Sequence, residues 1–183
     1  NELSGNMPSY TNVYAGKIDI THPINNSSKI SAGTKFSFIE GDNNVIFLRK
    51  QNNNWVNDFR TNHYVYKEYI TAGYINWEKK FKKYTMQVGL RAEATQTKGH
   101  QLTVDTTINR NYINFFPNVS LGYHINEKHD IIFSYAKRIT RPDYEDLNPF
   151  VIKLDSLSEF AGNTNLIPET SSSFEIGYSY NSK

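Results

Sequence analysis

The chain lacks cysteine and long apolar runs, and each absence excludes classes of protein. Its 183 residues include no cysteine, so disulfide scaffolds, thiolate metal sites and cysteine nucleophiles are excluded. Mean hydropathy is −0.62, and no apolar stretch approaches the roughly 20 residues that a membrane-spanning helix requires. A transmembrane β-barrel stays open, because only alternate residues of its strands face lipid.

A large net charge and glycine-rich motifs are also missing. The net charge of +2 is too small to indicate a nucleic-acid partner. The ten glycines form no phosphate-binding loop and no Gly-x-Ser-x-Gly nucleophile motif. The five histidines are not spaced as metal ligands, so we predict no metal site. One dense basic cluster is more typical of a solvated turn than of a phosphate site: Lys79, Lys80, Lys82 and Lys83.

Apolar and polar residues alternate along most of the chain, which is the pattern of strands with two different faces. At 84–97, Leu90 falls on an apolar face, whereas Arg91 and Glu93 fall on a polar face. The alternation predicts an all-β protein, an antiparallel up-and-down meander of about seven strands. The facing of the third strand is ambiguous. The strands are expected at 11–22, 29–39, 64–78, 84–97, 111–125, 130–139 and 173–180.

The connections between these strands alternate in length. Long polar loops are expected near 40–63, 98–110 and 142–172, with a hairpin extension at 45–49. Short turns are expected near 23–28, 79–83 and 126–130. Antiparallel strands place all the short turns at one end and all the long loops at the other. Outer-membrane barrels have this asymmetry, and a soluble sandwich has less reason to have it.

Three motifs follow one another late in the chain, between two alternating strands. They are Arg-x-x-Arg-Pro at 138–142, Leu-Asn-Pro-Phe at 147–150 and Gly-Asn-x-x-Leu-x-Pro-Glu at 162–169. Their order resembles the barrel region of TonB-dependent outer-membrane receptors, and more narrowly the β-barrel outer-membrane proteins common in Bacteroidetes. The Gly-Leu-Arg-Ala-Glu stretch at 89–93 is similar to the same family. The resemblance covers about residues 10–180 and implies the middle to late part of a barrel.

The resemblance implies a non-enzymatic wall segment of a transporter in the bacterial outer membrane, importing a bulky solute without a bound cofactor. Its implied partners are the lipid bilayer, the remainder of the barrel, an N-terminal plug and, indirectly, the TonB energy-transducing complex. Residues 1–183 are then one partial outer-membrane β-barrel domain. The odd number of strands, the absence of a terminal aromatic residue and the lack of a signal segment favour a piece of a longer or processed protein.

Three groups of candidate functional residues follow from this reading. Polar side chains expected to face the lumen are Arg91, Glu93, Asn118, Arg138 and Glu175. Residues expected to brace the start of the last loop are Arg141, Pro142, Asp146, Asn148 and Pro149. Loop aromatics that can contact a ligand, although packing among the loops is the commoner role, are Trp55, Phe59, Tyr112, Phe150 and Phe160.

Two other readings stay open at this point. A soluble or secreted all-β binding module could use the long loops to hold a protein or a sugar. A glycoside hydrolase would need two convergent carboxylates in a cleft. The acidic group Asp143, Glu145 and Asp146 lies near Arg138 and Arg141 in sequence, and a charge network that braces the loop is the simpler explanation for it.

Overall fold

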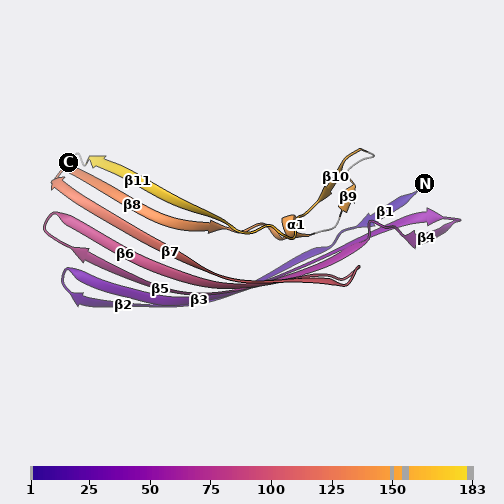
Figure 1. Cartoon of the computed structure of the whole chain (residues 1–183), viewed down its shortest axis with the longest axis horizontal. Coiled ribbons are helices and arrows are strands. Elements are labelled where there is room, and N and C mark those ends of the chain that lie inside the picture. The colour runs from indigo at the N-terminus through magenta and orange to yellow at the C-terminus, as the bar shows by residue number, and fades with distance from the viewer. Residues whose placement is uncertain (1, 149–150, 154–156, 181–183) are drawn as a thin grey trace.

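The structure is a computed structural model that describes residues 2–148, 151–153 and 157–180. Seven long strands pair antiparallel, each with the next, in one twisted sheet (Figure 1). The long strands are β2 (Ser9–Asn25), β3 (Ser28–Gln51), β5 (Asn62–Lys80), β6 (Tyr84–Gln101), β7 (Thr106–Asn126), β8 (His129–Thr140) and β11 (Glu169–Tyr180). This arrangement confirms the predicted all-β antiparallel meander.

Four short strands and one helical turn complete the described structure. β1 (Leu3–Asn6) and β4 (Asn54–Asn57) both pair with the far end of β3, which makes the sheet nine-stranded. β9 (Val151–Lys153) and β10 (Glu159–Ala161) pair with each other, and α1 (Tyr144–Leu147) precedes them. Within the described residues, β2 pairs only with β3 and β11 only with β8, so the sheet is open.

Two of the expected long loops are much shorter than the sequence indicated. Residues 40–51 belong to β3 and residues 98–101 to β6, and only 102–105 connect β6 to β7. The β3–β5 ladder continues through polar pairs such as Glu40 with Lys67, whose side chains form a 2.8 Å ion pair. Polar residues on both faces of a strand hide its alternation, so a stretch such as 40–44 resembles a loop in the sequence.

The turns and loops gather at opposite ends of the sheet. Residues 26–27, 81–83 and 127–128 connect consecutive long strands at one end, on the left in Figure 1. The connections of β3 to β5, β6 to β7 and β8 to β11 lie at the other end.

The register of the ladders shows which side chains share a face, because directly paired residues point to the same side. One row runs through Asp19, Gly33, Tyr74, Arg91 and Phe116. We call this side the polar face and the opposite side, which carries Leu90, the apolar face. The same rows give the facing of the third predicted strand, which the sequence left ambiguous. The even-numbered side chains of β5 lie on the polar face.

Burial is inverted relative to that of an ordinary soluble sheet. Thr95 is 1% exposed and Glu93 is 8% exposed, both on the polar face. On the apolar face, Ile18 is 68% and Ile176 is 81% exposed. A soluble monomer rarely leaves a continuous apolar surface of this kind uncovered.

Gly33 allows an aromatic side chain to lie flat on the polar face. A methyl group at Gly33 would lie 2.7 Å from Cε1 of Tyr74 and 2.6 Å from the carbonyl oxygen of Ile18. The Tyr74 side chain extends over Gly33, and its hydroxyl donates a 2.5 Å hydrogen bond to Oδ1 of Asp19. One glycine thus links three neighbouring strands through a side chain.

We predict that Gly33→Ala displaces Tyr74 and destabilises the protein by about 1–3 kcal/mol, the usual cost of overpacking. The matched control is Gly73→Ala, because a methyl group there meets nothing within 4 Å. Urea denaturation followed by tryptophan fluorescence measures both variants. Equal midpoints would show that the Tyr74 contact does not need a glycine beneath it.

Candidate functional site

Strands β7 and β8 separate part-way along the sheet. Their ladder runs from Asn126 and His129 to Asn118 and Ala136, whereas β8 continues with β11 as far as Thr140. The next residue of β7, Pro117, pairs with β6 inside an unbroken ladder, so its nitrogen points toward β8. That nitrogen carries no hydrogen and cannot continue the β7–β8 ladder. The chain after β8 therefore leaves the sheet (Figure 1).

Arg141 attaches the departing chain to the polar face, across β7 and onto β6. Its Nη2 lies 2.6 Å from Oε2 of Glu93 and 3.2 Å from the Thr95 hydroxyl. The other oxygen of Glu93 accepts a 2.6 Å hydrogen bond from Nε of Arg91. The largely buried carboxylate thus has two guanidinium partners, which offset the cost of taking it out of water.

The two later motifs of the loop are joined by backbone hydrogen bonds. The Gly162 amide donates to the Asn148 carbonyl at 2.9 Å, and the Asn163 amide donates to the Asp146 carbonyl at 2.6 Å. A second arginine of the wall, Arg110 in β7, donates from its guanidinium to the carbonyl oxygens of Thr164 and Leu166. The loop therefore has one anchor at Glu93 and another at Arg110.

The ion pair that the structure describes at the start of the loop runs from Arg141 to the wall. Arg141 pairs with Glu93 of the wall, and neither of the described acidic side chains that follow it, Asp143 and Asp146, forms an ion pair with it. The reason is the early end of the β7–β8 ladder, which brings Arg141 over β6. Asp146 takes part through its backbone carbonyl, and Asp143 is exposed. Pro142 follows Arg141 outside any strand, and Pro149 lies outside the described residues.

The five side chains expected to face the lumen all lie on the polar face, in different surroundings. Arg91 and Glu93 belong to the cluster with Arg141. Asn118 lies beside Gly89, where a methyl group would approach its Nδ2 to 2.6 Å. Arg138 is exposed, and Glu175 accepts a 3.2 Å hydrogen bond from Ser173.

The loop aromatics do not gather in one place. Trp55 is in β4 with the Lys50 ammonium 6.0 Å from its ring centre, and Phe59 lies beside the Arg60 guanidinium at 5.6 Å. Tyr112 is on β7 and lies beside Arg141. Phe160 is an exposed residue of β10. The remaining candidate, Phe150, lies outside the described residues.

A carboxylate beside Phe59 has an altered acidity. Asp58 is buried at the long-loop end and accepts a 2.6 Å hydrogen bond from Nε of Arg60. This side-chain hydrogen bond holds the pKa of Asp58 below its usual value. The same bond raises the pKa of Arg60.

The sequence patterns missed a group of buried polar residues beneath the loop. The Tyr66 hydroxyl donates a 3.0 Å hydrogen bond to Glu68, and the Gln101 amide donates to Asn62. Burial raises the pKa of Tyr66 and of its neighbour Tyr64. Only about 20 Å³ of space is left where Leu147 of the loop meets the two tyrosines.

One sequence signal could have revealed this group. Gly99 sits inside a strand opposite Tyr66, and a methyl group on it would meet the Tyr64 hydroxyl at 2.2 Å. A glycine inside a strand often marks such a close approach.

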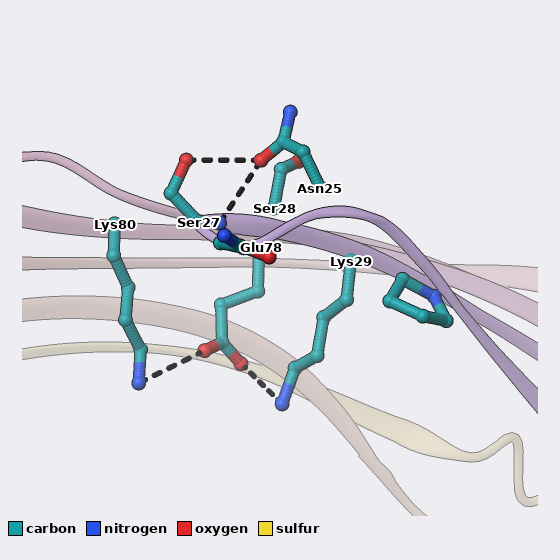
Figure 2. A pocket seen from close by; sticks show the side chains of 8 residues that line it. Asn25, Ser27, Ser28, Lys29, Glu78 and Lys80 are labelled. Carbon is teal, nitrogen blue, oxygen red and sulfur yellow. Dashed lines mark hydrogen bonds and ion pairs between the residues drawn. The ribbon is translucent and has the colours of Figure 1, made fainter.

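A hollow of about 510 Å³ lies at the short-turn end, around the β2–β3 turn. Figure 2 shows Lys29 and Lys80 reaching Glu78 from two sides, at 3.0 and 4.0 Å. Asn25 shapes the turn, because its Oδ1 accepts hydrogen bonds from the amide and the hydroxyl of Ser27. The two lysines therefore share one carboxylate.

Neither a metal-binding cluster nor a membrane-spanning helix occurs in the described ranges. Among residues 2–148, 151–153 and 157–180, no three His, Cys, Asp or Glu side chains are placed to hold a metal ion. No helix in that part of the chain is long and apolar enough to cross a membrane.

We predict that Arg141→Ala releases the loop from the wall. Losing a charge-assisted contact of this kind costs about 1–3 kcal/mol, so amides in 142–168 should exchange hydrogen roughly 5- to 150-fold faster. Hydrogen-exchange mass spectrometry measures this change. Arg138→Ala is the matched control, because Arg138 is exposed and has no carboxylate within ion-pair distance among the described residues. Identical exchange in the two variants would contradict the anchoring role.

Comparison with known proteins identifies the family. The family model described as "Outer membrane protein beta-barrel family" matches residues 1–183. No curated protein matches the chain. The unliganded ferric citrate transporter FecA is a structural neighbour with a TM-score of 0.67 and 10% identity, over 97% of this chain and 26% of that one. The ferric yersiniabactin uptake receptor FyuA from Yersinia pestis has a TM-score of 0.65 and 14% identity, over 100% and 28%.

These matches confirm the resemblance that the late motifs indicated, while an origin in Bacteroidetes stays a prediction. The chain spans about a quarter of the length of either structural neighbour. At such low identities the similarity shows the fold alone: an antiparallel wall like that of a TonB-dependent receptor barrel. The chain belongs to the outer membrane protein β-barrel family and is a β-barrel component of the bacterial outer membrane.

Proposed function

We propose that the chain forms part of the barrel wall of a TonB-dependent receptor that imports a bulky solute. In this proposal the apolar face contacts lipid and the polar face lines the lumen. The observation that carries the proposal is the inverted burial of the sheet. Apolar side chains are exposed on one side, while charged and hydroxyl groups are buried on the other.

The apolar face has the composition of a membrane-facing band. Along the seven long strands, this side carries no Asp, Glu, Lys or Arg over long described stretches. These stretches are 14–24 in β2, 30–38 in β3, 69–77 in β5, 84–96 in β6, 111–125 in β7, 131–135 in β8 and 172–180 in β11. A transmembrane barrel needs such a band, because charge on its lipid face is destabilising.

The height of the band and its borders agree with a bilayer. The run from Tyr84 to Ala94 rises about 34 Å along β6, which becomes roughly 26 Å at the usual strand tilt, close to the typical 25 Å. Tyr84 and Tyr123 stack at 4.9 Å near the short turns. Phe38 and Tyr69 stack at 4.7 Å toward the long loops. Aromatic rows of this kind mark the two interfaces of outer-membrane barrels.

The polar face has the lateral pairing that a charged lumen wall requires. Glu93 is shared by two arginines, and Lys17 pairs with Asp19 at 3.0 Å. Arg141, Thr164 and Leu166 attach the loop to this face, so its described ends narrow the lumen. Of the five polar candidates, the exposed Arg138 and Glu175 would meet an N-terminal plug or a passing solute, whereas Arg91 and Glu93 are engaged with Arg141. Transport, driven indirectly by the TonB complex, fits this surface better than catalysis.

The competing reading is a soluble or secreted binding module. It requires a second layer to cover Ile18, Leu90 and Ile176, which are 68%, 45% and 81% exposed. The described chain supplies no such layer, since the loop between β8 and β11 anchors to the opposite face. The sidedness of the sheet therefore favours the membrane wall.

Spin labels at two adjacent positions test the sidedness. The chain has no native cysteine, so Leu90→Cys and Arg91→Cys each introduce one labelling site into it. In the complete protein in bilayers, the label at 90 should collide mainly with lipid-soluble oxygen, and the label at 91 with a water-soluble nickel complex. Equal lipid contact at both positions would reject the assignment.

Epitope tags test the orientation. Tags inserted in the turns at 52–53 and 102–105 should be labelled on intact cells, because the long-loop end is proposed to be extracellular. Tags at 26–27 and 82–83 should be labelled only after the outer membrane is opened. A tag at 102–105 that stays inaccessible on intact cells would reverse the proposed direction.

A further inference from the structure

The apolar face is hollowed at the short-turn end, between the β5–β6 turn and β8. The open groove has a volume of about 530 Å³, within the range of small-molecule sites. Its principal lining residues are Phe81, Tyr84, Met86, Leu121, Ile131 and Phe133. The groove therefore suits a hydrocarbon chain.

The rim of this groove at the short-turn end is basic. Lys79 pairs with Met86 on the apolar face, and its ammonium lies 5.3 Å from the centre of the Phe81 ring. Lys82 and Lys83 are exposed in the turn that follows. Lys128, in the neighbouring turn, adds a further positive charge, and Glu127 beside it is the acid in that turn.

The rim lysines differ from the lysines of the polar face. Lys29 and Lys80 are both paired with Glu78 (Figure 2). Lys79, Lys82 and Lys83 have no carboxylate within ion-pair distance among the described residues. Their charges are available to an external anion at the mouth of an apolar groove.

We propose that the groove and the rim lysines bind one anionic phospholipid. Its acyl chain occupies the groove, and its phosphate contacts the ammonium groups of Lys79, Lys82 and Lys83. The proposal rests on the proposed membrane placement, because the Tyr84–Tyr123 row then lies at the interface and the lysines lie at headgroup depth. Juxtamembrane lysines attract anionic lipids, and their flexible stems can cover apolar surface while the charge reaches the headgroup.

Native mass spectrometry of the complete detergent-solubilised protein tests the site. The probes are phosphatidylglycerol, which is anionic, and phosphatidylcholine, which is neutral overall. The unaltered protein should bind its first phosphatidylglycerol more tightly than phosphatidylcholine. The double variant Lys82→Gln/Lys83→Gln should lower the phosphatidylglycerol affinity roughly 30-fold, equivalent to about 2 kcal/mol.

Two controls separate this site from general attraction. The double variant Lys98→Gln/Lys137→Gln removes two lysines of the apolar face toward the long-loop end. It should leave the affinity for phosphatidylglycerol unchanged. Leu121→Trp fills the groove and should weaken the first phosphatidylglycerol, whereas Ile113→Trp, on the same strand and face outside the groove, should not.

Three results would overturn the proposal. They are equal binding of the two lipids, equal losses in the two lysine pairs, and full retention of phosphatidylglycerol by Leu121→Trp. If one occurs while the label at Leu90 still contacts lipid, the lipid site fails and the barrel placement stands. Without lipid contact at Leu90, both fail together.

Discussion

A β-strand turns successive side chains to opposite sides, and in this chain that constraint separates two environments along every long strand. The antiparallel register keeps the separation intact from β2 to β11, because paired residues always share a face. A one-residue slip of β6 against its neighbours would place Glu93 among apolar side chains. The buried side can therefore be polar, provided that its charges find partners, while the exposed side can be a continuous apolar band.

The loop depends on a small exception to this regularity. Pro117 lacks the N–H donor that would continue the β7–β8 ladder. After Ala136, the rest of β8 as far as Thr140 therefore pairs with β11 alone. That divergence carries Arg141 over β6, where Glu93 already has one guanidinium partner. Removing either charge would leave the other partly buried without full compensation. The contacts of Arg141 with Glu93 and of Arg110 with the loop backbone then hold the loop on the polar face.

Much of the fold could be predicted, because the alternation of apolar and polar residues is visible in the sequence without any knowledge of tertiary contacts. The strand at 84–97 and its two faces, for example, follow from an alternation that puts Leu90 on one side and Arg91 and Glu93 on the other. The long ends of β3 and β6 could not be recognised, because strands that are polar on both faces lack that alternation. Glu40 and Lys67 confirm this reason, since they pair across a ladder in a stretch that resembles a loop.

The candidate site was harder to predict because its contacts are distant in sequence. The motif containing Arg141 indicated a braced loop, but its partner Glu93 belongs to a strand two positions away in the sheet. Nothing local to either residue specifies the other. The tyrosines beneath the loop were missed for a similar reason, since Tyr64 and Tyr66 resemble ordinary strand aromatics until Gly99 is seen opposite them.

The lysines at the short-turn end show how sidedness gives one residue type two roles. Lys80 faces the same side as Glu78 and forms an ion pair with it, as does Lys29 from the neighbouring strand. Lys79, one residue earlier in β5, faces the opposite side, where no acidic side chain of the described ladders lies near it. Its charge is therefore uncompensated at the border of the apolar band. In water such a lysine is an ordinary solvated residue, but at a membrane interface it lies where anionic headgroups concentrate.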